Sequence, residues 1–593
     1  MDSVNSFKGY GKVDEAQNLA LKKKTRKRLT LLIVAGVVLV AVIIAAVAAT
    51  VVHKKKSESS ESATPSSPSE LSPSTSLKAI CSATRFPESC FNSISKLPSS
   101  NTTDPEILFK LSLKVIIDEL DSISDLPEKL SKDTDDERIK SALRVCGNLI
   151  EDALDRLNDT VSAMDAFDDD GVKKRTLNSS RIEDLKTWLS ATVTDQETCF
   201  DSIDELAGNK TEYRNSTITK NLKSAMSGST EFTSNSLAIV SKILAALSNL
   251  GIPIHGRRRL LNHHQPSVDF PEWARRRLLQ TENVKPDVTV AADGSGDVKT
   301  VNEAVARVPK KSLKLFVIYV KAGTYVENVV MDKGKWNVMI YGDGKAKTII
   351  SGSKNFIDGT PTYETATFAI QGKGFIMKDI GIINTAGATK HQAVAFRSGS
   401  DFSVYYRCSF DGFQDTLYPH SNRQFYRDCD VTGTIDFIFG SAAVVFQGCK
   451  IMPRQPLPNQ FNTITAQGKK DPNQNSGMSI QRCSISANGN VTAPTFLGRP
   501  WKEFSTTVIM ETEIGPVVRA SGWMSWVSGV DPPASIVYGE YKNTGPGSDV
   551  SQRVKWAGYK PVMSEMDAAK FTVATLLHGG DWIPSTGVTH QLS

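Results

Sequence analysis

The sequence has little of what several common chemistries require. Its 593 residues include only eight cysteines and eight histidines. The histidines are scattered without the spacing of zinc ligands, and so few cysteines exclude a small disulfide-dense scaffold. The glycine-rich Asp293-Gly-Ser-Gly296 lacks the Lys-Ser/Thr that completes a phosphate loop, and no nucleic-acid-binding motif is evident. We therefore expect no metal, no cofactor and no nucleic-acid partner.

The overall composition is that of a globular protein with several domains. Hydrophobic residues make up 40% and charged residues 23%, which excludes wholesale disorder, collagen and a polytopic membrane protein. The net charge of +6 conceals two opposed regions. Residues 77–250 carry 21 basic and 29 acidic residues (−8), whereas 285–593 carry 32 basic and 26 acidic residues (+6). Such opposite charges are consistent with electrostatic complementarity between the two regions.

Residues 29–52 form a run of 24 residues without a charge. As a helix this run is ~36 Å long, enough to cross a ~30 Å hydrocarbon core. Basic residues flank it on both sides: Lys22, Lys23, Lys24, Arg26, Lys27 and Arg28 before it, and Lys54, Lys55 and Lys56 after it. We predict a cytosolic basic tail at 1–28 and a transmembrane signal anchor at 29–52 that directs the rest into the secretory pathway. A cleaved signal peptide is the alternative.

A Ser/Pro-rich linker is predicted at 53–76, because this stretch offers almost no apolar surface to bury. Six Asn-x-Ser/Thr glycosylation candidates follow the predicted anchor, as a secretory route requires. They are Asn101, Asn158, Asn178, Asn209, Asn215 and Asn490.

Residues 77–250 are predicted to be helical. Apolar residues recur at helical spacing in 104–126, 139–157, 182–206 and 237–247, which favours a four-helix bundle. Asp104 precedes Pro105, a sequence typical of a helix start. Cys81, Cys90, Cys146 and Cys199 can pair in three ways, and oxidation is expected in the secretory lumen.

Residues 251–284 contain two near-copies of one basic signal, each followed by two leucines. The copies are Arg257, Arg258 and Arg259, and then Arg275, Arg276 and Arg277. Two copies between folded regions favour processing by a secretory-pathway protease, because cleavage needs accessible backbone. Which site is used stays open.

From residue 285 to 593 short β-branched and aromatic segments alternate with Gly, Asn and Asp turns, which predicts an all-β domain. Asp415 lies 23 residues after Gln392 and 21 residues before Asp436. Cys408 and Cys429 are also 21 residues apart. This interval is typical of one coil of a parallel β-solenoid, so it predicts one surface column of acids and amides and a Cys408–Cys429 disulfide. The pairing of Cys449 and Cys483 is left open.

Five motifs then occur in order. They are Gly323-Thr-Tyr325-x-Glu327, Gln392-Ala-Val-Ala-Phe-Arg397, Gly412-Phe-Gln414-Asp415-Thr-Leu-Tyr418, Asp436-Phe-Ile-Phe-Gly440 and Leu497-Gly-Arg499-Pro-Trp501. Together they resemble the plant pectin methylesterase (pectinesterase) family across 285–593. Residues 77–250, with successive cysteines 9, 56 and 53 residues apart, resemble the pectin methylesterase inhibitor domain. The resemblance implies an all-α four-helix bundle followed by a right-handed parallel β-helix.

The resemblance also implies an activity and a set of roles. The expected reaction is hydrolysis of pectin methyl esters to polygalacturonate and methanol in the cell wall or apoplast. Asp436 would be the nucleophile of an acyl-enzyme mechanism and Asp415 the acid and base, with oxyanion-stabilising amides from Gln392 and Gln414. A Gly-x-Ser-x-Gly elbow is lacking in this domain, so a serine nucleophile has no support. Substrate-binding residues implied by the family motifs are Thr362, Gln392, Arg499 and Trp501.

Two positions depart from the family pattern without removing a reacting group. Ser441 stands where the family usually has Asn, and Phe396 where it usually has Leu. A β-helical pectin lyase or galacturonase is the competing enzyme interpretation, and a regulatory protein with a silent β domain is the non-enzymatic one. The helical domain could inhibit the enzyme in cis before processing, assist its folding or retain the precursor, and pectinesterase inhibitors could act in trans.

Overall fold

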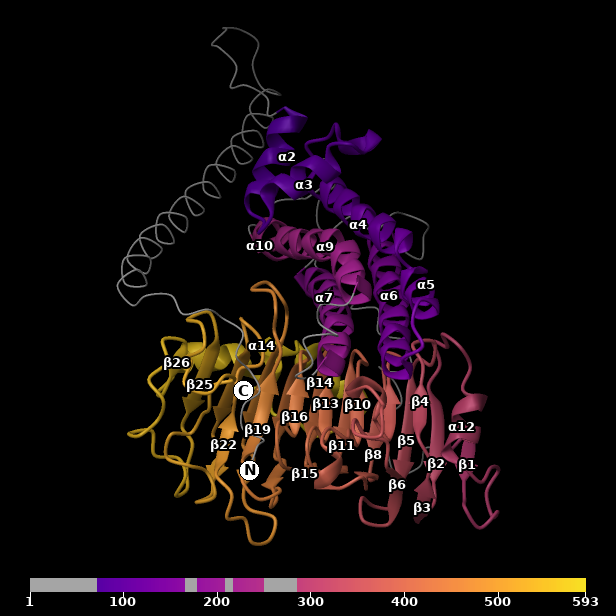
Figure 1. Cartoon of the computed structure of the whole chain (residues 1–593), viewed down its shortest axis with the longest axis vertical. Coiled ribbons are helices and arrows are strands. Elements are labelled where there is room, and N and C mark those ends of the chain that lie inside the picture. Colours follow the sequence, from indigo (N-terminus) through magenta and orange to yellow (C-terminus); the bar gives the residue numbers. More distant parts are fainter. Residues whose placement is uncertain (1–71, 166–178, 208–216, 250–284) are drawn as a thin grey trace, which may run out of the picture.

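The computed structural model describes residues 72–165, 179–207, 217–249 and 285–593. Figure 1 shows a helical N-terminal unit standing on one side of a long β domain. The predicted signal anchor at 29–52, all but the last residues of the linker at 53–76 and the processing segment at 251–284 lie outside the described residues. In the described ranges, no helix combines the length and the apolar character needed to cross a membrane.

The helical unit is a four-helix bundle, as predicted, with shorter helices beside it. The long helices α4, α6, α7 and α9 pack against one another. The helices are α2 (Pro73–Ser82), α3 (Pro87–Ile94), α4 (Pro105–Ser122), α5 (Leu126–Lys132), α6 (Glu137–Asp165), α7 (Ser179–Ala207), α9 (Thr217–Ala238) and α10 (Ala245–Asn249), with a π-helical segment at Ile239–Leu244 and a 3₁₀ turn at Pro98–Ser100. Of the three possible pairings, the structure has Cys81–Cys90, which joins α2 to α3, and Cys146–Cys199, which joins α6 to α7.

Capping residues explain where these helices begin. Asp104 accepts hydrogen bonds from the backbone N–H groups of Glu106 and Ile107, so α4 begins at Pro105 as the sequence indicates. The expected boundary at residue 77 is too late, because Ser72 caps α2 in the same way and Pro73 occupies its first turn. The last helical segment also begins earlier than 237, since Thr217–Ala238 is already helical.

The β domain consists of three parallel sheets whose strands follow one another in turn around a β-helix. The eleven-stranded sheet contains β1 (Val288–Val290), β2 (Phe316–Val320), β5 (Val338–Gly342), β8 (Ile376–Lys378), β11 (Ser403–Tyr406), β14 (Arg423–Arg427), β17 (Ala443–Gln447), β20 (Gly477–Gln481), β23 (Thr506–Met510), β25 (Val537–Tyr541) and β26 (Tyr559–Lys560). The seven-stranded sheet contains β4 (Val329–Met331), β7 (Phe368–Ile370), β10 (Phe396–Ser398), β13 (Leu417–Pro419), β16 (Ile438–Gly440), β19 (Asn462–Gln467) and β22 (Thr495–Gly498). The eight-stranded sheet contains β3 (Gly323–Val326), β6 (Thr348–Gly352), β9 (Gly381–Asn384), β12 (Ser409–Asp411), β15 (Asp430–Gly433), β18 (Lys450–Pro453), β21 (Ser484–Ile485) and β24 (Glu513–Ile514).

Short helices lie at the N-terminal end of the β domain and on the outer face of its eleven-stranded sheet. Helix α12 (Val301–Arg307) begins with a capping box between Thr300 and Glu303. The C-terminal segment contains α13 (Glu565–Ala568) and α14 (Val573–Leu576), and it packs Val573 and Trp582 against the outer face of the eleven-stranded sheet. The 3₁₀ turns are Thr362–Glu364, Ala388–Lys390, Ala569–Phe571, Gly579–Asp581 and Ile583–Thr586.

Strand register confirms the 21-residue coil. Leu417 on β13 is paired with Ile438 on β16, and Ser409 on β12 with Asp430 on β15. Inside the coils, aromatic rings stack from one strand to the next, with Tyr405 and Tyr426 at a centroid distance of 4.4 Å. The parallel β-helix expected for residues 285–593 is therefore observed.

The predicted Cys408–Cys429 disulfide is absent from the structure. The two residues do lie in one column, continued by Cys449 and Cys483 in the next coils, and all four thiols are free and buried. The Cys408 N–H donates to the Cys429 sulfur at 3.4 Å. In-register neighbours are ~4.7–4.9 Å apart with parallel side chains, whereas a disulfide needs Cβ atoms about 3.5–4.5 Å apart and sulfurs turned toward each other. Vertical stacking alone therefore does not produce the bond.

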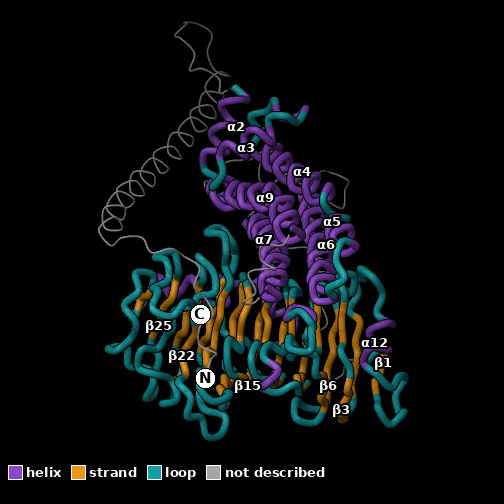
Figure 2. Tube along the Cα trace, in the orientation of Figure 1, coloured by secondary structure: helices purple, strands orange, loops and turns teal. Residues whose placement is uncertain are grey.

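The helical bundle rests on the outer face of the seven-stranded sheet. Figure 2 shows the lower ends of α6 and α7 reaching the strands of the β domain. The hydrophobic core of the bundle continues without a break into Tyr363, Val394, Tyr418 and Phe439 of that face. The two units therefore share one buried apolar surface.

Candidate active site

Asp415 and Asp436 lie side by side in successive coils, each just before a strand of the seven-stranded sheet. The pairing of Leu417 with Ile438 two residues later sets them in the same column. Both aspartates have a left-handed backbone, with φ of 65° and 50°. Asp tolerates this conformation better than most residues, and such backbone strain concentrates at functional sites. The two residues are 7% and 5% exposed, so the pair is nearly removed from water.

Asp436 is held by a charge-assisted fork. The Arg499 Nε lies 2.9 Å from Asp436 Oδ1, and Arg499 Nη2 lies 2.5 Å from Oδ2. Thr463 adds a second support, because its hydroxyl donates to Asp436 Oδ1 at 2.6 Å and accepts the Asp436 N–H at 2.8 Å. These contacts fix the plane of the carboxylate.

Asp415 has a different environment although it is the neighbour of Asp436. Burial raises the pKa of Asp415 well above its ordinary value, and the negative charges of Asp436 and Glu205 raise it further against the lowering effect of Arg499. Burial and the neighbouring negative charges thus favour the protonated form of Asp415, which can donate a proton. The pair therefore consists of one carboxylate gripped by a cation and one carboxyl group whose proton is bound more tightly than usual, an arrangement suited to acid–base and nucleophilic chemistry.

Gln392 and Gln414 are brought together by an isolated parallel bridge between their coils. They are 22 residues apart, whereas Phe396 and Leu417 pair at 21, so one extra residue is accommodated before β10. This offset sets Gln392 beside Gln414 and not beside Asp415. The column predicted from the sequence therefore holds, with a shift of one position at its first member.

Aromatic residues line the site next to the carboxylates. Trp501 is half-buried and lies 6.2 Å from both Trp526 and Phe439, measured between ring centroids. The Arg499 guanidinium lies over the Trp526 ring at 4.2 Å. Flat rings beside a reacting centre can stack against the apolar face of a sugar.

The helical bundle reaches directly into this site. Glu205 on α7 accepts the backbone N–H of Thr362 at 2.9 Å, and the Thr362 hydroxyl is buried without a hydrogen-bond partner. Lys502, the residue after Trp501, is paired with Asp201 and lies 3.6 Å from Glu197. Burial raises the pKa of Glu205 to about 7. Carboxylates of α7 therefore occupy the surroundings of Asp415 and Asp436.

Seven of the predicted residues lie together here: Thr362, Gln392, Gln414, Asp415, Asp436, Arg499 and Trp501. Three residues that the sequence did not indicate lie with them. Thr463 follows Asp436 by 27 residues, outside the 21-residue interval, because a longer excursion separates β18 from β19. Trp526 lies on a C-terminal loop with no periodic signal. Glu205 comes from the other domain, and sequence spacing carries no information on how two domains meet. Ser441 is not among the residues that contact Asp436.

Comparisons with known proteins agree with this geometry. A family model described as Pectinesterase matches residues 287–581, and one described as Plant invertase/pectin methylesterase inhibitor matches residues 75–239. Pectinesterase 1 of Arabidopsis thaliana is 87% identical over 594 residues, covering 100% of both chains. Pectinesterase 3 of Phaseolus vulgaris is 60% identical over 595 residues, covering 99% of both. The solved pectin methylesterase from carrot is 50% identical with a TM-score of 0.51, and covers 52% of this chain and 98% of its own.

The fold, the site and these likenesses define a carboxylic ester hydrolase built on a right-handed parallel β-helix and preceded by an inhibitor-like helical domain. The chain belongs to the pectinesterase family.

Proposed function

We propose that this protein removes methyl groups from pectin in the plant cell wall, releasing methanol and leaving polygalacturonate. The observation that supports this most is the pair of carboxyl groups in successive coils: Asp436 is gripped by Arg499 and Thr463, and Asp415 lies beside it. A methyl ester needs a nucleophile for its carbonyl carbon and a proton for its leaving methoxide. The pair offers one group for each task.

In the first half of the reaction an Asp436 oxygen attacks the ester carbonyl carbon. The carbonyl electron pair moves to oxygen, and the side-chain amides of Gln392 and Gln414 donate hydrogen bonds to the resulting oxyanion. When the carbonyl re-forms, the bond to the methoxy oxygen breaks and Asp415 gives its proton to that oxygen. Methanol leaves, and the galacturonyl group remains joined to Asp436 as an anhydride.

In the second half Asp415, now ionised, takes a proton from water. The hydroxide oxygen bonds to the acyl carbon, and the bond to Asp436 breaks. The product is a free galacturonate carboxyl group, and Asp436 returns to the Arg499 fork as a carboxylate. Trp501 supports the sugar ring throughout, and Thr362 contacts the chain nearby.

Methanol release by residues 285–593 tests the mechanism. The solved carrot enzyme matches this part alone over 98% of its length, so the β domain folds without the bundle. Asp436→Ala should abolish turnover and Asp415→Asn should lower kcat by about 10²–10⁴-fold, whereas Asp531→Ala, at an exposed position, should leave it unchanged. Wild-type activity equal to that of Asp436→Ala would refute the mechanism, and shortening of the polymer would favour the lyase or galacturonase interpretation.

We further propose that the helical domain inhibits the enzyme in cis until it is removed. The supporting contacts are Glu205 on the Thr362 N–H and the pairing of Asp201 with Lys502, both beside the catalytic carboxylates. The intact chain should release methanol much more slowly than the same chain cut after Arg277. Equal rates would refute inhibition in cis and would favour a folding or retention role for the helical domain.

The remaining expectations concern the route to the wall. We propose the domain order stated from the sequence, with the anchor at 29–52 and processing near Arg259 or Arg277 in segments outside the described residues. Asn101, Asn158 and Asn490 are exposed in the structure, as glycosylation needs. Asn178, Asn209 and Asn215 lie outside the described residues. N-terminal sequencing of the wall-bound protein identifies the cleavage site.

A further inference from the structure

A cavity of about 70 Å³ lies between the two domains, at the N-terminal end of the catalytic face. On the β-domain side its lining includes Lys311, Lys333, Trp336 and Lys373. We call these four residues the N-terminal basic patch. Lys333 and Trp336 lie in the turn between β4 and β5, and Lys373 lies in the turn between β7 and β8. Strand β7 is two coils from β13 in the seven-stranded sheet, a distance of about 10 Å along the axis.

The patch concentrates positive charge around one aromatic ring. The Lys373 ammonium lies 3.9 Å from the Trp336 ring centroid and the Lys311 ammonium 5.6 Å from it. The Trp336 indole donates to the Lys333 carbonyl at 2.8 Å, which fixes the ring on the same turn. The ammonium groups of Lys311 and Lys373 share this ring, and the ammonium group of Lys333 lines the same cavity, so anions in the cavity would relieve the repulsion between these charges. The patch is therefore built to receive negative charge.

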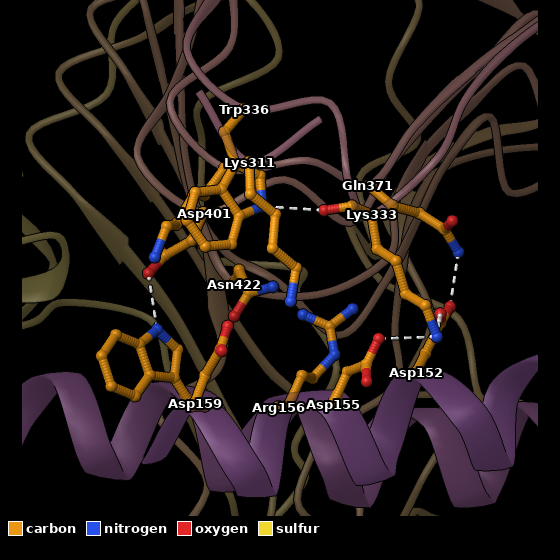
Figure 3. A pocket seen from close by; sticks show the side chains of 12 residues that line it. Asp152, Asp155, Arg156, Asp159, Lys311, Lys333, Trp336, Gln371, Asp401 and Asn422 are labelled. Atoms are coloured by element: carbon orange, nitrogen blue, oxygen red, sulfur yellow. Dashed lines mark hydrogen bonds and ion pairs between the residues drawn. The ribbon is translucent and has the colours of Figure 1, made fainter. Parts of the chain in front are cut away.

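In this structure the anions come from helix α6. Lys333 Nζ lies 2.8 Å from Asp155, 3.4 Å from Asp152 and 3.8 Å from Glu151. Asp152 also accepts from the Gln371 amide at 2.6 Å. Figure 3 shows the acidic side chains of α6 pointing at these groups, with Lys333 between Asp152 and Asp155. Asp152 and Asp155 are one turn apart, so the helix presents both carboxylates on one face.

We propose that the N-terminal basic patch binds the carboxylates of unesterified galacturonate residues once the helical domain has left, and that α6 occupies the patch in their place. The inference rests on the proposed function, because it takes the polymer bound at the catalytic pair to extend along the same face. Trp336 offers a sugar-stacking surface, and the lysines offer ion pairs to the carboxylates on either side of it. A fully methylated segment has no charge to offer here, so the patch favours polymer that already carries free acid.

The test compares two ligands on residues 285–593. Methanol release from fully methylated pectin is measured with a completely de-esterified oligogalacturonate as competitor. The variant Lys333→Glu/Lys373→Glu should raise the inhibition constant of the competitor about tenfold and remove most of its salt dependence. Its kcat on the methylated substrate should stay within about twofold of wild type. Lys450→Glu, an exposed lysine on the eight-stranded sheet, is the matched control.

The outcomes separate this inference from the function on which it rests. An inhibition constant that is unchanged in the double variant overturns the patch, whatever the turnover. Loss of turnover on methylated pectin equal to the loss of competitor binding also overturns it, because the patch would then act on both ligands alike. The milder Lys333→Gln/Lys373→Gln variant and its melting temperature guard against misfolding. Failure of the wild-type fragment to release methanol would refute the proposed function instead.

Discussion

The guanidinium of Arg499 contacts both carboxylate oxygens of Asp436, at 2.9 and 2.5 Å. Arg499 lies two residues before Trp501, so one short segment after β22 supplies both the cation and an aromatic ring of the site. Arg499 is itself backed by the Trp526 ring at 4.2 Å. The orientation of Asp436 therefore depends on the planar guanidinium of Arg499, which lies between this carboxylate and the Trp526 ring.

Replacing Arg499 by lysine should lower kcat sharply. Lysine keeps the charge but cannot contact both oxygens at once, so the carboxylate is free to rotate. We expect residues 285–593 carrying Arg499→Lys to lose about 10²-fold in kcat with KM changed only about threefold. Arg519→Lys, at an exposed position, is the control. Unaltered turnover in Arg499→Lys would show that the fork is not needed.

Inhibition by the helical domain should weaken as the pH rises. Burial raises the pKa of Glu205 from an ordinary 4.5 to about 7 in the docked form, and the pKa values of Asp415 and Asp201 are raised in the same way. The docked form thus binds protons more tightly than the separated form. The stabilisation by Glu205 is complete below about pH 4.5 and is lost as the pH passes 7.

The measurement is the ratio of methanol release by the intact chain to that by residues 285–593, between pH 5 and about pH 7.5. We expect this ratio to rise with pH in the wild type and to rise less steeply in Glu205→Gln, which cannot ionise. Glu119→Gln, which removes a carboxylate from α4 and leaves α7 unchanged, serves as the control. A ratio that falls with pH, or a slope unaffected by Glu205→Gln, contradicts the prediction.

A buried ion pair near the C-terminal end of the β-helix should matter for stability. The Glu540 carboxylate accepts from Arg553 at 2.9 and 3.1 Å, from the Tyr559 hydroxyl at 2.7 Å and from the Trp523 indole at 3.1 Å. Arg553→Met leaves this carboxylate buried without its cation and should lower the free energy of unfolding by about 3–5 kcal/mol. Urea unfolding of residues 285–593 measures this loss in the free energy of unfolding.

The exposed pair of Lys560 and Asp567 is the natural comparison. Its charges are 3.0 Å apart but more accessible, with side chains 52% and 25% exposed. Lys560→Met should therefore lower the free energy of unfolding much less than Arg553→Met does. Equal effects for the two substitutions would mean that the Glu540 cluster contributes no more than a surface pair.

The two disulfides of the helical domain should differ in their effect. Cys146–Cys199 closes a loop with a sequence separation of 53, and Cys81–Cys90 one of 9. Loop-closure entropy predicts losses of about 4 and about 2.5 kcal/mol when each pair is replaced by serine. Thermal unfolding of the intact chain under oxidising conditions should rank the variants in this order, and the reverse ranking would mean that the α2–α3 hairpin depends on its bridge for more than entropy.

The sequence predicted the features that recur at the 21-residue interval and missed those that do not recur. The 21-residue interval set Asp415 beside Asp436 because one coil of the β-helix has that length, and the register bears this out. The same interval predicted the column of Cys408 and Cys429 correctly but not their redox state, since periodicity locates backbones and not the direction of a sulfur. Thr463 was missed because its coil is longer than the others.

The regular interval of the β-helix could not predict the contacts between the two domains. The opposite charges of the two regions indicated that they could attract each other, but not that Glu205 would reach Thr362 or that α6 would meet Lys333. The helix starts, by contrast, depend on local sequence signals that can be recognised without knowing the contacts between domains. Asp104 was recognisable as a cap because its signal is local, and Ser72 was overlooked because it lies within a serine-rich stretch where one cap resembles its neighbours.

The shared core beneath the bundle has a consequence for biosynthesis. Tyr363, Val394, Tyr418 and Phe439 form an apolar strip that belongs to one buried core with residues of α6 and α7. A strip of this kind promotes aggregation when it is exposed in a crowded compartment. Because the bundle precedes the β domain in the chain, the ribosome completes it before the strip exists, and domains fold in that order. A bundle that folds before the strip is synthesised would keep these side chains covered while the β domain folds.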